Sequence, residues 1–488
     1  MACAVSARRG PPTSPNRIAD SPMALISRPL PETCGRRAKR KSRVPRAGPV
    51  GGLVDFFTFK SPLAIGMPCD VVFPMVAVRH EHMHQPSVKK AVFRKIMALF
   101  NWSITIAEQG IGPSLGFQGE DLKTCAHPES IRHEIIGKEI AGGFRACYTG
   151  VKHDTKAKME LHCEKQWWQC TWLCMDCFAC KPGAKDAPPA LNFKDFSPTA
   201  FWRSTVLSDE EFEAYWAPHE LSPCFQIRGH SHGLAYWDWM HIVPLGILRD
   251  HCATHIWIWI RNHLVPEAIL DRDLALRGLW DDLCGFCKEK GFAKPWGATF
   301  TLSSLGIGDK NNPEYPELGS AFKATAVTTI MRWIARKSSE IDVANTDHSK
   351  ARQVNAWAMA ELQFVLDMGG WLLTPREIKR AKYATNMYLM TWQFLANEAV
   401  RDNERLWKIR PKHHYFCHLM DRCFSDGQNP CKALQNAAEE SYLGVVKRIG
   451  QRCHGASVYV RLLQRLLLFL TLRWKRRQET GAWRILKR

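Results

Sequence analysis

Helical periodicity dominates the second half of the chain. Downstream of Asp238, apolar residues recur every three or four positions, which is typical of helices that bury one face. The pattern predicts helices over residues 242–263, 266–290, 320–338, 350–368 and 375–403. It predicts two more near the C-terminus, at about 433–449 and 457–478. We therefore expect a helix-rich protein.

Upstream of Asp238 the pattern changes. The segment GGFRACYTGVKHD predicts a strand that ends at Asp154, and the good helix formers of KAKMELHCEKQW follow it. Ser208 precedes three acidic residues and predicts the N-cap of a helix within 207–216. Residues 1–50 are rich in Pro, Arg and Ser and predict a disordered basic leader. Residues 51–140 carry no signature of function.

Charge narrows the class of partner. The 488 residues carry a formal net charge of +20, which favours a polyanion, with nucleic acid preferred over an anionic membrane surface. A merely basic protein is the alternative. No stretch reaches the roughly 18 apolar residues of a membrane span. The basic cluster 36–43 predicts nuclear import, although an organelle transit peptide would share its composition.

Cysteine and histidine spacing predicts a zinc site. The chain has 18 cysteines but no secretory signal, so we expect reduced thiols, some of them bound to metal. Cys174 and Cys177 form a C-x-x-C knuckle, and His414 and His418 would share one face of a helix. Further candidate ligands flank these pairs: Cys170, Cys180 and His413. Buried core thiols and histidines are the alternative.

Acidic residues suggest a second kind of metal site. Asp154 follows the predicted strand, Asp238 lies three positions before His241, and Glu439 and Glu440 lie on a late predicted helix. Three converging carboxylates could hold two Mg²⁺ or Mn²⁺ ions, which clamp the attacking and leaving oxygens of a phosphodiester exchange. Taken singly, each acid is better explained as a helix cap or a surface charge, and only the order and context of the set favour a metal site.

The order of these motifs resembles the DDE/D transposases of the CACTA/Mirage/Chapaev group. In that family an Asp is followed by C-x-x-C, D-x-x-H, H-x(3–4)-H and a helical Glu. This chain offers, in that order, Asp154, Cys174 with Cys177, Asp238 with His241, His413 or His414 with His418, and Glu440. The tail Cys423-Phe424, Glu440, Gly444 and Cys453-His454 is also similar to transposase-derived reading frames of protist genomes.

The resemblance covers roughly residues 140–475 and implies an α/β RNase H-like core with a large all-α insertion. It implies DNA cleavage and strand transfer with two Mg²⁺ or Mn²⁺ ions on Asp154, Asp238 and Glu440, with His241 supporting Asp238. Glu439 competes with Glu440 for the third position. It also implies a structural Zn²⁺ on Cys174, Cys177, His414 and His418.

These expectations divide the chain into five parts. They are a leader (1–50), a region of unknown role (51–140), the first part of the core with the knuckle (141–265), the helical insertion (266–410), and the His pair with the C-terminal core helices (411–488). We expect the partner to be DNA and the protein to lie in the nucleus, and the protein could form a homo-oligomer. Two rivals are a non-catalytic, zinc-stapled DNA-binding protein derived from such an enzyme and a helical scaffold with core cysteines.

Overall fold

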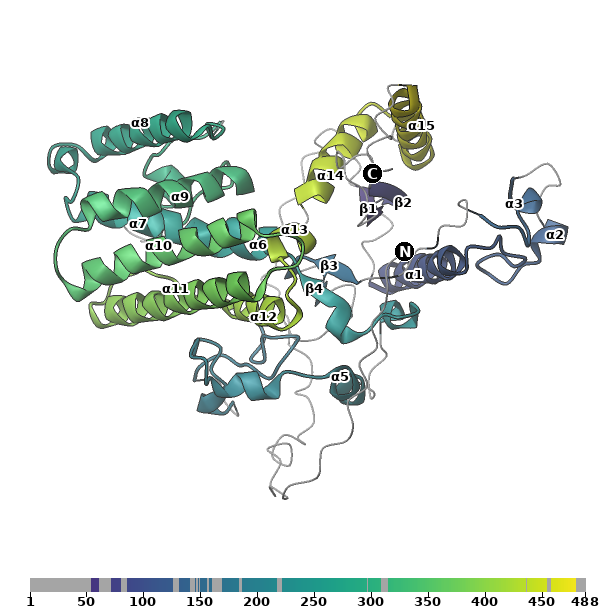
Figure 1. Cartoon of the computed structure of the whole chain (residues 1–488), viewed down its shortest axis with the longest axis horizontal. Coiled ribbons are helices and arrows are strands. Elements are labelled where there is room, and N and C mark those ends of the chain that lie inside the picture. Colours follow the sequence, from purple (N-terminus) through teal and green to yellow (C-terminus); the bar gives the residue numbers. More distant parts are fainter. Residues whose placement is uncertain are drawn as a thin grey trace, which may run out of the picture. The chain divides into compact units, whose positions relative to one another are not determined.

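The computed structural model confirms that the protein is helix-rich (Figure 1). It describes residues 54–60, 72–79, 86–125 and 131–140, scattered positions within 145–170, and 171–479 apart from short gaps at 184–186, 217–221, 296, 309–314, 436 and 454–457. The predicted leader and its basic cluster 36–43 lie outside the described residues. So does most of the helix expected directly after Asp154.

A layer of long helices, green and teal in Figure 1, makes up the larger part of the described residues. Neighbouring helices pack through apolar faces. On α9, for example, Val327, Ile330, Met331 and Ile334 are all fully buried at helical spacing. The helices are α7 (Leu248–Arg261), α8 (Arg272–Lys290), α9 (Ala324–Ile341), α10 (Asp347–Met368), α11 (Pro375–Arg401) and α12 (Pro411–Asp426).

Local sequence signals set the helix boundaries. Thr346 and Thr374 each begin a capping box, at the start of α10 and α11, and Pro375 occupies the first helical position of α11. α8 begins later than the predicted residue 266, which lies in a preceding 3₁₀ turn. Its N-cap is Asp271, whose side chain accepts the amide of Asp273.

The helix predicted from residue 242 is interrupted. α6 (Trp239–Ile242) starts earlier than expected, directly after Asp238, and passes into a π-helical turn, Val243–Ile247, before α7 begins. Pro244 has no backbone N–H, so the regular hydrogen-bond ladder cannot continue through it. The periodicity of the apolar residues is the same on both sides, which is why the pattern alone predicts one helix.

Two small sheets occur among the described residues. β1 (Val54–Lys60) and β2 (Val72–Arg79) pair antiparallel, and β3 (Val151–His153) and β4 (Ala235–Trp237) pair parallel. The expected RNase H-like core needs a larger sheet than β3 and β4, and the described residues show none. Only its helix-rich character and this parallel pair are therefore established.

The remaining helices are shorter or lie toward the chain ends. α5 begins as predicted, since Ser208 Oγ accepts the amide of Glu211 at 3.1 Å and the Glu211 carboxylate accepts the amide of Ser208. No helix among the described residues combines the length and apolar character that crossing a membrane requires. The remaining helices are α1 (Pro86–Gln109), α2 (Leu122–Cys125), α3 (Ile131–Glu134), α5 (Asp209–Trp216), α13 (Pro430–Ala433), α14 (Ala437–Gly450) and α15 (Val458–Glu479).

Candidate metal centre

Two cysteines and two histidines meet in the interior. Cys174 and Cys177 of the knuckle face His414 and His418 of α12, and all four side chains are buried. One ligand atom from each lies within 4.8 Å of the other three. The structure thus brings together the four predicted zinc ligands from segments more than 200 residues apart.

The spacing of the ligand atoms suits a tetrahedral ion. Cys174 Sγ lies 3.3 Å from His418 Nε2, Cys177 Sγ lies 3.3 Å from His414 Nε2, and the two imidazole nitrogens are 3.1 Å apart. Zn–S bonds of about 2.3 Å and Zn–N bonds of about 2.0–2.1 Å give edges of about 3.5 Å (S to N) and 3.3 Å (N to N). The group can therefore bind a metal ion such as zinc with little rearrangement.

Aromatic residues fix both halves of this centre. The ring centroid of Trp202 lies 4.3 Å from that of His414 in an edge-on contact, which orients the imidazole. Next to His414, the Tyr415 hydroxyl donates to the carbonyl of Leu173 at 2.8 Å. That hydrogen bond ties α12 to the residue that precedes the knuckle.

The protonation of the metal-free centre is unequal. Burial raises the pKa of the Cys177 thiol well above its usual value. Burial also opposes ionisation of Cys174, but its hydrogen bond with Cys177 and the nearby imidazole of His418 outweigh that effect and lower its pKa. Two adjacent buried thiolates need a cation between them, so a bound divalent ion would displace the second proton.

The three supplementary candidates do not join the group of four. The Cys180 thiol donates to the carbonyl of Leu191 at 3.5 Å. His413 Nδ1 instead accepts the backbone amide of Arg410 at 3.2 Å and helps cap the start of α12. Cys170 lies half-buried before the knuckle.

Asp154 and Asp238 follow two paired strands. β3 and β4 run in parallel register, with His153 opposite Trp237, and the amide of Asp238 donates to the carbonyl of His153 at 3.0 Å. Each Asp is the next residue of its strand, so the two backbones are about 5 Å apart at this point. The acid pair, meaning Asp154 and Asp238, thus lies at one sheet edge.

Asp238 is fully buried and also begins α6. Its side chain accepts the amides of Met240 at 3.3 Å and His241 at 3.1 Å, which makes it the N-cap. The His241 ring bonds to the same carboxylate through Nδ1. The cap and the contact between Asp238 and His241 are therefore both present, as the D-x-x-H spacing suggested.

The third acid is less completely described. Glu439 and Glu440 belong to α14, but their side chains lie outside the described residues. The segment just before α14 is hydrogen-bonded to residues next to the acid pair. Lys152 Nζ donates to the carbonyl of Gln435 at 3.0 Å, and the amide of Trp239 donates to the carbonyl of Leu434 at 2.9 Å.

A buried carboxylate that the sequence did not single out lies between the two cysteines. Asp176 bonds to Lys158, to Trp237 Nε1 at 2.5 Å and to His232 Nε2 at 3.3 Å. Burial alone would raise the pKa of Asp176, but Lys158 and His232 hold it well below its usual range. The only signal in the sequence is an acid inside C-x-x-C, since its three partners lie between 18 and 61 residues away.

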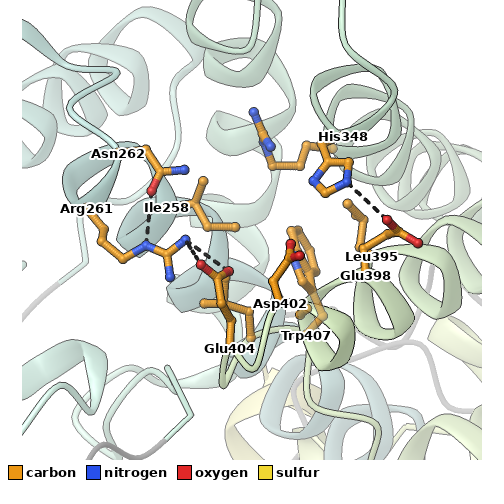
Figure 2. Close-up of a pocket in the computed structure, with 12 residues that line it drawn as sticks. Ile258, Arg261, Asn262, His348, Leu395, Glu398, Asp402, Glu404 and Trp407 are labelled. Carbon is orange, nitrogen blue, oxygen red and sulfur yellow. Dashed lines mark hydrogen bonds and ion pairs between the residues drawn. The ribbon is translucent and has the colours of Figure 1, made fainter.

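A polar hollow lies elsewhere, between α7, α10 and α11 (Figure 2). Arg261 pairs with Glu404 at 3.0 Å, and His348 lies 3.5 Å from Glu398. Its charges are thus largely paired within the protein. None of the predicted site residues lines it.

Comparison with protein-family models, curated proteins and solved structures finds no match to this chain. The roles of its residues therefore rest on the geometry described above.

Proposed function

We propose that the protein is a transposase-like enzyme that cleaves DNA strands and transfers them through a two-metal acid centre. Asp154, Asp238 and Glu440 would hold two Mg²⁺ or Mn²⁺ ions, and Glu439 is the alternative third ligand. The ions would stabilise charge on the attacking and leaving oxygens. Water, and then a DNA 3′-hydroxyl, would be the nucleophile.

The observation that carries this proposal is the position of the acid pair. Asp154 and Asp238 follow neighbouring parallel strands whose register is fixed by the pairing of His153 with Trp237. Carboxylates at adjacent strand ends can ligate shared divalent ions, because Mg²⁺ takes carboxylate oxygens and retains waters for substrate phosphates. In RNase H-like terms, β3 and β4 would belong to the core sheet.

The contact between half-buried His241 and buried Asp238 would have a clear role in such a centre. With Nδ1 bonded to the carboxylate, the ring keeps that oxygen oriented. His241 would thus support Asp238 without itself reacting.

The proximity of α14 supports the third ligand. Gln435 and Leu434 are hydrogen-bonded to Lys152 and Trp239, which flank the acid pair in sequence. Glu439 and Glu440 are the third and fourth residues of α14, four and five positions after Gln435, and one of them would complete the centre.

Charge and the zinc centre support the same function. The net charge of +20 favours a polyanionic substrate, and DNA in the nucleus is the one we propose. The Cys₂His₂ group would serve as a structural zinc that joins the knuckle to α12.

The test is divalent-metal-dependent nicking of labelled duplex DNA by the full chain. Wild type is compared with Asp238→Asn and with a matched control, Asp271→Asn, which makes the same change at the N-cap of α8. We expect Mn²⁺-dependent nicking that only Asp238→Asn abolishes. Equal nicking by all three proteins would remove Asp238 from the mechanism.

A second function is favoured by one observation. Asp238 is wholly buried and already engaged as a helix cap, which suits a purely structural acid. The protein would then be a non-catalytic, zinc-stapled DNA-binding relative of the enzyme. DNA affinity without metal-dependent cleavage, unchanged when all three acids are replaced, would favour this alternative.

A further inference from the structure

Asp176 joins the zinc knuckle to both strand ends that carry the acid pair. It lies between Cys174 and Cys177, and only 9% of its surface is exposed. Its two carboxylate oxygens contact different parts of the chain. One bonds to Lys158, and the other accepts Trp237 Nε1–H at 2.5 Å.

The Lys158 contact reaches the first acid. The amide of Lys158 donates to the carbonyl of Asp154 at 2.9 Å, so Lys158 ends the first turn after that residue. Its side chain is completely buried, and its ammonium lies 4.3 Å from the centre of the Trp237 ring. A buried ammonium needs its carboxylate, so the turn after Asp154 is tied to the knuckle.

The Trp237 contact reaches the second acid. Trp237 is the last residue of β4 and directly precedes Asp238. Its ring stacks on Tyr415, with centroids 4.3 Å apart and planes 10° apart. Tyr415 follows the zinc ligand His414, so both halves of the metal centre hold Trp237.

We propose that Asp176 is a positioning residue that couples zinc occupancy to the geometry of the acid pair. Zinc would fix the knuckle, the knuckle would fix the Asp176 carboxylate, and that carboxylate would hold the residues next to Asp154 and Asp238. The effect on divalent-ion binding rests on the proposed function. The mechanical coupling of the two regions does not.

The alternative is that Asp176 only neutralises Lys158. In that case, zinc removal and Asp176 substitution would alter stability, but neither would change the β3–β4 pair selectively. Measurements that resolve this strand pair therefore separate the two possibilities.

The first measurement is hydrogen exchange of the full chain, followed by mass spectrometry of peptides containing the Asp238 amide. That amide is protected by its bond to His153. In wild type we expect zinc removal to speed its exchange by about tenfold or more, because the strand end opens more often. In zinc-loaded Asp176→Asn the exchange should be fast although zinc is present.

Two further variants keep the test decisive. Asp176→Asn leaves Lys158 buried without its counter-charge and could unfold the chain. Trp237→Phe is therefore tested beside it: it removes the hydrogen bond to Asp176 and some buried ring volume, but keeps both Asp176 and an aromatic ring against Tyr415. The matched control is Asp421→Asn, which removes a carboxylate from the same helix, α12, where exposed Asp421 pairs with half-buried Arg203. We expect the Asp238 amide to exchange faster in Trp237→Phe than in wild type and at the wild-type rate in Asp421→Asn.

The second measurement is Mn²⁺ affinity by titration calorimetry of zinc-loaded protein. We expect Asp176→Asn and Trp237→Phe to bind Mn²⁺ about tenfold more weakly while retaining one zinc per chain, a magnitude typical of residues that orient ligands. Zinc-loaded variants with wild-type exchange and wild-type Mn²⁺ affinity would overturn the coupling. Asp176-dependent protection in a wild type that binds no Mn²⁺ would instead support the coupling and overturn the proposed enzyme.

Discussion

Cys177 Sγ lies 3.3 Å from His414 Nε2, although 237 residues separate the two in the chain. A metal ion at this point closes a very long loop, and closing such a loop in the unfolded chain is entropically costly. Binding energy at the centre is therefore folding energy for the parts it joins. The stability of the knuckle and α12 would then depend on the ion and, through the coupling proposed above, so would that of the β3–β4 pair.

Zinc binding is the first consequence to measure. We expect wild type to contain one zinc per chain by elemental analysis and Cys177→Ser to contain none. Loss of the ion should lower the free energy of unfolding by several kcal/mol, since structural zinc contributes on the order of 10 kcal/mol in small domains. Unfolding by denaturant, with and without a chelator, measures the change.

Cys180→Ser is the matched control, since Cys180 is a buried neighbouring thiol outside the group of four. It should retain zinc and respond to chelator as wild type does. Zinc lost equally from both variants would mean that the ligand set includes Cys180.

The two roles of Asp238 can be separated by choice of substituent. Asn caps helices as well as Asp does, so Asp238→Asn should leave the free energy of unfolding within about 0.5 kcal/mol of wild type, whereas Asp238→Ala should cost about 1 kcal/mol. Denaturant unfolding of zinc-loaded protein gives both values. Asp271→Ala at the N-cap of α8 should cost a similar amount. If Asp238→Asn proves as destabilising as Asp238→Ala, capping is not what the carboxylate contributes.

Much of the helical layer was predictable because the apolar spacing and caps that define each helix lie within its own sequence. Residues 350–368 and 375–403 were expected to be helical, and α10 and α11 match these ranges to within three residues. Buried residues at helical spacing and local caps determine such elements. The π turn was missed because Pro244 changes the hydrogen bonding without altering the apolar pattern.

The zinc ligands were predictable from local spacing and ligand chemistry. Cys174 and Cys177 form a knuckle and His414 and His418 lie one helical turn apart, so spacing reveals each pair, and the four-ligand preference of zinc predicts that the two pairs meet. Asp176 could not be found in this way, because its contact with Trp237 depends on how distant segments pack.

The hydroxyl of Tyr415 should matter to the zinc centre although it is not a ligand. Tyr415→Phe removes the 2.8 Å bond to Leu173 but keeps the ring that stacks on Trp237. We expect a loss of about 1 kcal/mol in stability and a zinc affinity lower by about tenfold, as for other residues that support metal ligands. Competition with a chromophoric chelator measures the affinity. Tyr383→Phe, on the exposed face of α11, should change neither quantity.

His255 should make the helical layer sensitive to acid. It is fully buried on α7, and burial, aided by Arg352, lowers its pKa to about 3. In the unfolded chain a histidine takes up a proton below about pH 6.5. Between these two values the unfolded state binds one proton more than the folded state, so stability falls as the pH falls, by about 1.4 kcal/mol per pH unit for this one site.

Replacing His255 by Phe removes that proton uptake while keeping a ring in the core. The difference in unfolding free energy between wild type and His255→Phe should therefore shift in favour of the variant as the pH falls from 6.5 toward 4. Denaturant unfolding at several pH values measures it, and contributions from zinc and from groups that do not contact His255 cancel in the difference. Parallel stability curves for wild type and His255→Phe would show that His255 is protonated in the folded protein and hence not isolated from water.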